Sequence, residues 1–275
     1  GYDLTRLYLG SEGTLGIITE VQLRLFGIPE HVASAICQFE TLDGAVQTAM
    51  LAMQVGIPVA RMELLDALQM AASIAYSRLE GLEEKPTLFL EFHGSPAGVA
   101  EQIEAFREIS SDFGGSNFLW AERLEERNRL WTARHMALFA ARAMRPGAHV
   151  YTTDACVPIS RLAECIDWCR EAAAAQGITA TVVGHVGDGN FHMILLFDPA
   201  NAEERAAADR VARAVAEAAI DMGGTITGEH GIGLHKQEAL VDEHGEGAVA
   251  VMRRLKQALD PLNIMNPGKV LPPAR

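Results

Sequence analysis

One stretch indicates the local fold most clearly, Gly184-His185-Val186-Gly187-Asp188-Gly189-Asn190-Phe191-His192. Asp-Gly between apolar runs is typical of a tight turn that joins two antiparallel strands. With that turn, Val186 pairs with Phe191 and His185 lies opposite His192. Opposed residues have Cβ atoms about 4.5–5.5 Å apart, so two imidazoles there could share one ion. We assign Asp188 and Asn190 to the turn itself.

A second motif, Gly228-Glu229-His230-Gly231, supplies a carboxylate and another imidazole. Imidazole and carboxylate groups suit Zn²⁺, Mn²⁺ or Fe²⁺, and three protein ligands leave a position open for substrate or water. We therefore assign His185, His192 and Glu229 as metal ligands. His230 would then be free to act as a general base. The alternative is a set of turn histidines bonded to carbonyl groups, which does not account for the joint pattern.

Arg134 lies in a helical pattern whose apolar stripe includes Leu130, Trp131 and Leu138. Helical spacing directs its guanidinium into that stripe, and a buried cation needs a partner. The partner is either an internal acid such as Asp154 or a substrate carboxylate, which a guanidinium can bind in bidentate fashion.

Short β-like runs alternate with amphipathic helical patterns from residue 31 onward. Strands are expected at residues 32–39, 59–64, 87–93, 117–120, 150–157, 179–186 and 191–197. Helices are expected at residues 43–54, 97–112, 124–143, 161–176, 202–222 and 246–259. Residues 7–25 are glycine-punctuated and then β-rich. We predict an α+β fold, a mostly antiparallel sheet covered by helices, whose β-α-β recurrence suggests two ferredoxin-like halves.

The bulk composition is that of an ordinary globular protein. The chain has 275 residues, of which 49% are hydrophobic and 21% charged, enough for a sizeable core. A net charge of −13 argues against nucleic-acid binding, which needs a basic surface. Four cysteines in a chain of this length are expected to be reduced thiols, so a cytoplasmic setting is predicted.

Several segments resemble a known family. Residues 183–192, 227–233 and 259–271 resemble the FAD-linked oxidase C-terminal domain of the vanillyl-alcohol-oxidase-type flavoproteins. Leu9-Gly10-Ser11-Glu12-Gly13-Thr14-Leu15-Gly16 resembles the end of their FAD-binding domain. Within the family, Arg134-His135, Arg145-Pro146-Gly147 and residues 153–160 are most similar to the cytochrome-type D-lactate dehydrogenases.

The resemblance implies a domain division. Residues 1–29 would be the tail end of the FAD-binding domain, residues 30–262 the substrate (cap) domain, and residues 263–275 a segment returning to the FAD domain. Because the pyrophosphate loop would lie upstream of Gly1, the chain looks like the downstream part of a longer protein. We expect it not to retain FAD alone and to be inactive in isolation.

The resemblance also implies roles for single residues. A divalent ion on the three assigned ligands would orient a 2-hydroxy acid, His230 would take the hydroxyl proton as hydride passes to flavin N5, and Arg134 would grip the carboxylate. FAD would be contacted by Glu12, Gly13, Ile18 and Asn266. Electrons would pass to a cytochrome or quinone. A homodimer and a peripheral association with a membrane are compatible with the family.

Two positions favour a small substrate. Relatives that act on the dicarboxylate D-2-hydroxyglutarate place a lysine near Thr152 and an asparagine at Ile194, and this chain has neither. D-lactate, oxidised to pyruvate, is therefore the expected substrate. Glycolate or another 2-hydroxy acid remains an alternative, as do a metal-binding module without chemistry and a metal-dependent hydrolase.

Overall fold

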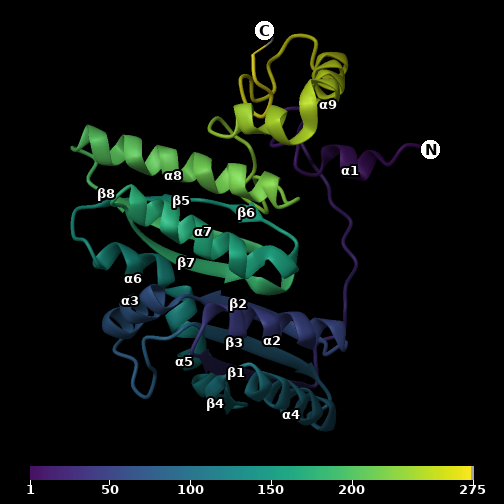
Figure 1. Cartoon of the computed structure of the whole chain (residues 1–275). Coiled ribbons are helices and arrows are strands. Elements are labelled where there is room, and N and C mark those ends of the chain that lie inside the picture. The colour runs from purple at the N-terminus through teal and green to yellow at the C-terminus, as the bar shows by residue number, and fades with distance from the viewer. Residues whose placement is uncertain (274–275) are drawn as a thin grey trace.

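Eight strands form one sheet in the computed structural model, which describes residues 1–273 (Figure 1). The strand order is β4-β1-β3-β2-β7-β8-β5, and β6 also pairs with β8. Every paired strand is antiparallel to its neighbour. The strands are β1 (His31–Phe39), β2 (Val59–Leu65), β3 (Thr87–Gly94), β4 (Gly115–Ala121), β5 (His149–Thr152), β6 (Ala155–Cys156), β7 (Thr179–His185) and β8 (Asn190–Phe197).

Helices cover both faces of this sheet, so the predicted α+β class is confirmed. Helices α2, α4, α7 and α8 pack on one face, and α3, α5 and α6 pack on the other (Figure 1). The helices are α1 (Leu4–Tyr8), α2 (Leu42–Gln54), α3 (Ala67–Ser77), α4 (Pro96–Asp112), α5 (Leu124–His135), α6 (Ala137–Ala143), α7 (Leu162–Ala175), α8 (Ala202–Asp221) and α9 (Gln237–Leu259). No helix among residues 1–273 combines the length and the apolar character needed to cross a membrane.

The sheet consists of two related halves. In the first, β1, α2, β2, β3, α4 and β4 give the strand order 4-1-3-2 of a ferredoxin-like fold. The second repeats β5, α7, β7, β8 and α8, with the order β7-β8-β5 in place of β2-β3-β1. The halves join where β2 pairs with β7, at Leu64 with Gly184 and Leu65 with Val183. This topology agrees with the predicted ferredoxin-like halves.

The alternation of side chains between the two faces of the sheet places the residues of the candidate site on one face. Met62 and Leu64 of β2 belong to the apolar cluster under α2 and α7, whereas Leu65 belongs to the cluster under α3, α5 and α6. Because successive side chains point to opposite faces, Glu63 shares the face of Leu65. By the same alternation, His185 and His192 lie on the face of Val183 and Ile194.

The predicted pairing of the two histidines is wrong by two residues. His185 pairs with Asn190, and His192 pairs with Val183. The turn has the expected four residues but begins one residue earlier, at Val186, because Val186–Asp188 forms a single 3₁₀ turn that ends at Gly189 with φ of +73°. Since the side-chain period of a strand is two, this shift leaves both imidazoles on the same face. They become diagonal neighbours.

Other boundaries differ from the predictions for local reasons. The expected strand at residues 150–157 is broken at Thr153 and Asp154, and the expected helix at residues 124–143 is interrupted at Met136. The last helix begins nine residues earlier than residue 246, with a break at Gly245. Helix α3 was not predicted, although Asp66 accepts a hydrogen bond from the Gln69 amide as an N-cap.

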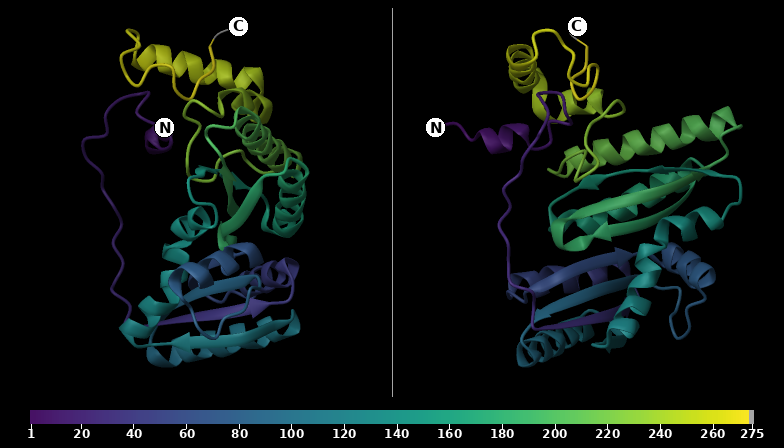
Figure 2. Two further views of the ribbon diagram at one scale, coloured as in Figure 1. Left: turned by 90° about the vertical axis from the view of Figure 1, so that its left-hand side faces the viewer. Right: turned by 180° about the vertical axis from the view of Figure 1, so that it is seen from behind.

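The β-rich segment at residues 7–25 forms no strand of this sheet. Apart from helix α1, the segment is a turn followed by extended chain, which runs from beside α9 to the start of β1 (Figure 2). Ile17, Leu25 and Ile28 are 79%, 86% and 96% exposed. A strand needs a neighbour to pair its backbone groups, and among residues 1–273 none lies beside this segment.

The turn between β7 and β8 allows a direct test of backbone fit. A Cβ at Gly189 would lie 2.1 Å from the Val157 carbonyl oxygen, whereas one at Gly177, with a similar φ of +68°, would meet nothing within 4 Å. We expect Gly177→Ala to lower the free energy of unfolding by about 1–2 kcal/mol through backbone strain alone. Gly189→Ala should cost about 1–3 kcal/mol more. Urea denaturation measures both, and equal losses would contradict the assigned turn.

Candidate metal centre

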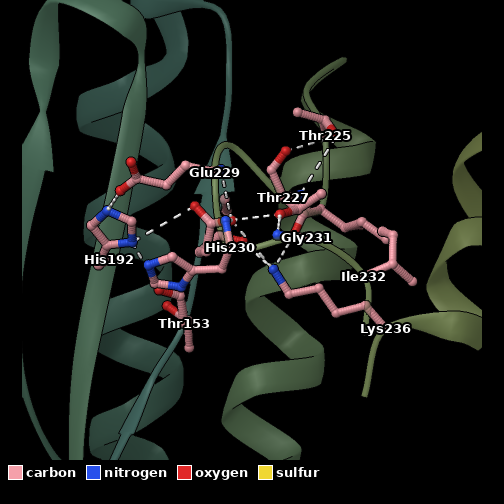
Figure 3. Close-up of polar contacts among 12 residues, drawn as sticks. Thr153, His192, Thr225, Thr227, Glu229, His230, Gly231, Ile232 and Lys236 are labelled. Atoms are coloured by element: carbon pink, nitrogen blue, oxygen red, sulfur yellow. Dashed lines mark hydrogen bonds and ion pairs between the residues drawn. The ribbon is translucent and has the colours of Figure 1, made fainter. Parts of the chain in front are cut away.

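Two strands and one loop bring three donor groups together. His185 ends β7, His192 lies in β8, and Glu229 lies in residues 227–233, the metal loop, between α8 and α9. The Glu229 Oε1 atom is 2.9 Å from His192 Nε2 and 3.2 Å from His185 Nε2. Figure 3 shows the Glu229 carboxylate directed at the His192 ring. The structure thus brings together the three ligands predicted from the sequence.

The hydrogen bond made by Nδ1 of each imidazole determines whether Nε2 is free to bind a cation. His185 Nδ1 lies 2.7 Å from Glu63 Oε1, and His192 Nδ1 lies 3.0 Å from the Thr153 carbonyl oxygen. Since both partners are acceptors, each Nδ1 carries the proton and donates it. In the neutral rings, each Nε2 atom then keeps a lone pair on the side of Glu229, where a cation could bind both rings and the carboxylate. Outer partners of this kind fix metal-binding histidines, so the donor set suits a divalent cation such as Zn²⁺, Mn²⁺ or Fe²⁺.

Glu63 is a residue of the candidate site that the sequence analysis missed. Its Oε2 atom accepts a hydrogen bond from Arg134 Nε at 2.9 Å and lies 2.9 Å from Arg134 Nη2 in an ion pair, while its Oε1 atom accepts from His185. Burial alone would raise the pKa of the Glu63 carboxyl, but His185 and Arg134 outweigh burial and lower it. The same hydrogen bond raises the pKa of His185. A charged residue amid the apolar run Met62, Leu64 and Leu65 was the available signal.

Arg134 therefore has an internal acid as its partner, and that acid is Glu63, not Asp154. The Arg134 side chain is 20% exposed and contacts the candidate metal centre through Glu63. A guanidinium has five N–H donors. Its Nε donor binds Glu63 and its Nη2 atom is paired with the same carboxylate, which leaves the Nη1 donors for another acceptor.

Asp154 anchors the metal loop. Its side chain is fully buried, in the break between β5 and β6. Oδ2 accepts from the Thr227 hydroxyl at 2.6 Å and from the amides of Glu229 and His230 at 3.1 and 2.9 Å. Oδ1 accepts from Asn190 Nδ2 at 2.8 Å. Burial would raise the pKa of Asp154, but these hydrogen bonds hold it well below its usual range.

These contacts correct one assignment and weaken an alternative ligand set. Asn190 was assigned to the turn, but its side chain holds Asp154 instead. Asp154, His192 and His230 also lie close enough to form a donor group. However, both Asp154 oxygens are occupied, and His192 Nδ1 donates to Thr153. The set of His185, His192 and Glu229 is therefore the better cation site.

His230 lies beside this group without belonging to it. Its ring stacks on that of His192, with centroids 4.7 Å apart and planes 12° from parallel (Figure 3). The residue is exposed, whereas His192 is buried. An accessible imidazole next to a metal ligand has the position that a general base requires. That role stays a prediction.

The residues predicted to contact FAD fall into two places. Asn266 Nδ2 donates to the Glu12 carbonyl oxygen at 2.6 Å, which brings the two ends of the chain together. The Glu12 carboxylate accepts from the amides of Ile232 and Gly233. Gly13 is exposed with φ of +70°, and Ile18 is 57% exposed on the extended segment. Their contact with FAD stays a prediction.

The contact between Glu63 and His185 gives a testable expectation. Glu63→Gln removes the charged acceptor that orients His185, and loss of such a partner typically weakens metal binding about 10–100-fold. Glu91→Gln is the matched control, because Glu91 makes a similar 2.7 Å contact with His93 elsewhere in the sheet. Zn²⁺ affinity, measured by competition with a chelating dye, should fall only in the first variant. Equal affinities would remove Glu63 from the site.

Comparison with known proteins identifies relatives over nearly the whole chain. The family described as FAD linked oxidases, C-terminal domain, matches residues 28–270. A probable mitochondrial D-lactate dehydrogenase of Danio rerio is 49% identical over 271 residues, covering 98% of this chain and 54% of that protein. A mitochondrial D-lactate dehydrogenase [cytochrome] of Arabidopsis thaliana is 46% identical, covering 99% and 48%. The glycolate oxidase subunit GlcD of Bacillus subtilis is 35% identical, covering 98% and 57%.

Solved structures share the fold at low identity. A 4-ethylphenol oxidase of Gulosibacter chungangensis superposes with a TM-score of 0.68 at 18% identity, covering 90% of this chain and 55% of that one. A p-cresol methylhydroxylase superposes with a TM-score of 0.67 at 14% identity, covering 90% and 54%. These likenesses show the fold alone.

The relatives correct the predicted cellular setting. Four D-lactate dehydrogenase relatives, from Danio rerio, Arabidopsis thaliana, Kluyveromyces lactis and Saccharomyces cerevisiae, are mitochondrial proteins. The cytoplasmic prediction is therefore contradicted. It rested on free thiols, which the structure retains at Cys37, Cys156, Cys165 and Cys169. Free thiols do not distinguish one reducing compartment from another.

The chain spans about half the length of the curated relatives that it matches. The family model covers residues 28–270, which is most of the chain. The resemblance noted in the sequence is confirmed. The chain belongs to the family of FAD-linked oxidases, C-terminal domain, with relatives among the cytochrome-type D-lactate dehydrogenases.

Proposed function

We propose that this chain is the substrate-binding and metal-binding part of an FAD-dependent dehydrogenase that oxidises D-lactate to pyruvate. The observation that carries the proposal is the convergence of His185, His192 and Glu229, with each imidazole oriented by an acceptor on its far nitrogen. Family membership and the D-lactate dehydrogenase relatives supply the reaction class.

The roles of the residues follow from their positions. When bound, the cation would polarise the 2-hydroxyl group and FAD would accept the C2 hydride. His185, His192 and Glu229 would hold that cation, with one position left for substrate. His230, accessible beside His192, would accept the hydroxyl proton. The oxidation then releases one proton and one hydride, and the electrons go on to a cytochrome or quinone.

Arg134 would hold the substrate carboxylate with the N–H groups that Glu63 leaves free. Glu63 then has two functions, because it fixes the guanidinium and also orients His185. A small hydroxy acid has few groups that a protein can bind besides its hydroxyl and its carboxylate. One metal contact and one guanidinium contact would suffice to fix its orientation.

The preference for a small side chain has structural support. Thr152 pairs with Ile194 across β5 and β8, and Ile194 is 2% exposed on the same face as His192. A second carboxylate placed there would be desolvated without a cation to bind it. D-lactate is therefore favoured over a dicarboxylate. The GlcD relative makes glycolate the second candidate.

A substrate panel tests the function. Full-length protein, assayed with an artificial electron acceptor, should oxidise D-lactate faster than glycolate and far faster than L-lactate or D-2-hydroxyglutarate. Faster turnover of glycolate would select the second candidate. Equal rates on both lactate enantiomers, or no turnover of either, would overturn the proposal.

We also propose the domain division in which residues 1–29 end the FAD-binding domain and residues 263–275 return to it. The extended, apolar and exposed residues 15–30 and the start of β1 at His31 support the first boundary. The contact between Asn266 and Glu12 supports the second. Residues 274 and 275 lie outside the described part. FAD retention by the full-length protein, and its absence from this chain, is the expected outcome.

A further inference from the structure

Glu229 is held in place by its backbone more than by its side chain. Its side chain is 52% exposed, whereas the His192 ring that it faces is 5% exposed. An exposed, flexible side chain reaches a ligand position reproducibly only when its Cα is fixed. The contacts that fix the metal loop therefore decide how well Glu229 can serve as a ligand.

One end of the metal loop is held by Asp154, and the other end is held by Glu12. Glu12 lies 220 positions before Ile232 in the chain, and its Oε1 accepts from the Ile232 amide at 2.7 Å. Its Oε2 accepts from the Gly233 amide at 2.9 Å. Hydrogen bonds from amides to a charged carboxylate are stronger than neutral ones. Glu229 lies at the end that Asp154 holds, three positions before Ile232, the first residue that Glu12 holds.

The Glu12 clamp is built to a fixed geometry. Glu12 has φ of +52°, a left-handed conformation that a non-glycine residue adopts at a cost. A Cβ at Gly231 would lie 2.7 Å from Glu12 Oε1, so only glycine admits the carboxylate this close. Asn266 Nδ2 donates to the Glu12 carbonyl, and the Val270 amide donates to the Gly233 carbonyl at 2.9 Å. Three segments distant in sequence thus meet at this clamp (Figure 2).

We propose that Glu12 is a positioning residue for the metal centre, whose carboxylate fixes the metal loop so that Glu229 can reach the cation. This inference rests on the proposed function of His185, His192 and Glu229 as ligands. Glu12 itself does not touch the cation. Without its carboxylate, residues 231–233 would lose two of the hydrogen bonds that hold them, and the loop would pivot about the Asp154 clamp.

The test compares Glu12→Gln with Glu20→Gln, a control at an exposed residue of the same N-terminal segment. Glutamine keeps the length and shape of Glu12 but presents an NH₂ group to one of the two amides. Because Glu12 belongs to none of the three apolar clusters, the variant is expected to fold. Zn²⁺ affinity of this chain should fall about 10-fold in Glu12→Gln, the lower end for outer partners of a metal site. It should be unchanged in Glu20→Gln.

Hydrogen exchange provides a second readout that needs no metal. The amides of Glu229 and His230 should exchange several-fold faster in Glu12→Gln, while those of β7 and β8 keep their rates. Faster exchange confined to Ile232 and Gly233, with unchanged Zn²⁺ affinity, would overturn the inference. Failure of the unaltered chain to bind Zn²⁺ would refute the proposed function. The exchange rates of the Glu229 and His230 amides would then still test whether Glu12 fixes the metal loop, because they should rise in Glu12→Gln.

Discussion

Replacing Asp154 with asparagine is expected to produce the largest loss of stability of any single change at the site. The carboxylate accepts four hydrogen bonds, and Lys236 Nζ lies 3.5 Å from Oδ2. Asparagine would turn an NH₂ group toward donors and leave a partly buried ammonium group without its counter-charge. Removing one partner of a buried ion pair costs about 3–5 kcal/mol, and we expect a loss of this size at pH 7 by urea denaturation.

Asp66→Asn is the matched control for this variant. Asp66 is also buried and also accepts two amide hydrogen bonds, from Gln69 and Val182, but it lies away from the metal loop. We expect Asp66→Asn to leave Zn²⁺ affinity unchanged, whereas Asp154→Asn should lower it more than 10-fold because the metal loop is released. A normal Zn²⁺ affinity in Asp154→Asn would show that the metal loop does not depend on this anchor.

The stability difference should also depend on pH. The pKa of Asp154 is lower in the folded chain than the value of about 3.9 expected in the unfolded chain. The ionised carboxylate therefore contributes stability that is fully present above about pH 4 and is lost as the pH falls toward the folded pKa. The difference in the free energy of unfolding between the unaltered chain and Asp154→Asn should therefore decrease below about pH 4. A difference that increases as the pH falls below about 4 would contradict the charged state assigned to Asp154.

Replacing His192 with glutamine is expected to have the largest effect on metal binding. His192 is the most buried of the three proposed ligands, and burial lowers its pKa, so the ring is neutral and its lone pair is available at pH 7. Loss of a ligand should exceed the 10–100-fold effect of outer partners, so Zn²⁺ affinity should fall more than 100-fold. In the full-length enzyme, D-lactate turnover should fall with it.

His149→Gln is the control for this prediction. His149 is exposed in β5, where it pairs with Phe197 at the far end of β8 from His192. Glutamine at position 149 should leave both Zn²⁺ affinity and turnover unchanged. Comparable losses in the two variants would indicate a general effect of altering β8 and its neighbour, and would count against His192 as a ligand.

Much of the architecture could be predicted from local pattern. The seven expected strands all correspond to strands of the sheet, because apolar alternation bounded by turn residues is a local signal. Helix α3 was missed because its short apolar pattern follows β2 without a break, and only the Asp66 cap marks its start. Residues 7–25 are rich in β-forming residues but form no strand, because β propensity does not supply a pairing partner.

The site could be predicted only in part, since its contacts join distant segments. The three proposed ligands could be predicted because they lie in two sequence motifs. The predicted pairing of β7 with β8 was wrong by two residues, but a shift of two leaves His185 and His192 on the same face of the sheet. Glu63 lies 122 positions from His185, and Asp154 lies 75 positions from Glu229. Glu63 belongs to no motif, and Asp154 lies in residues 153–160, whose resemblance to the family does not indicate its role as an anchor. Their importance depends on which strand lies beside which, and that is a property of the tertiary structure.

Anomalous X-ray diffraction from crystals of this chain grown with Zn²⁺ tests the central claim most directly. Data collected on either side of the zinc absorption edge should give a peak about 2.0–2.2 Å from His185 Nε2, His192 Nε2 and a Glu229 oxygen, with the Nδ1 contacts to Glu63 and Thr153 retained. Absence of a peak there, or a peak bound by Asp154 and His230 instead, would contradict the assignment of these three residues as the metal centre.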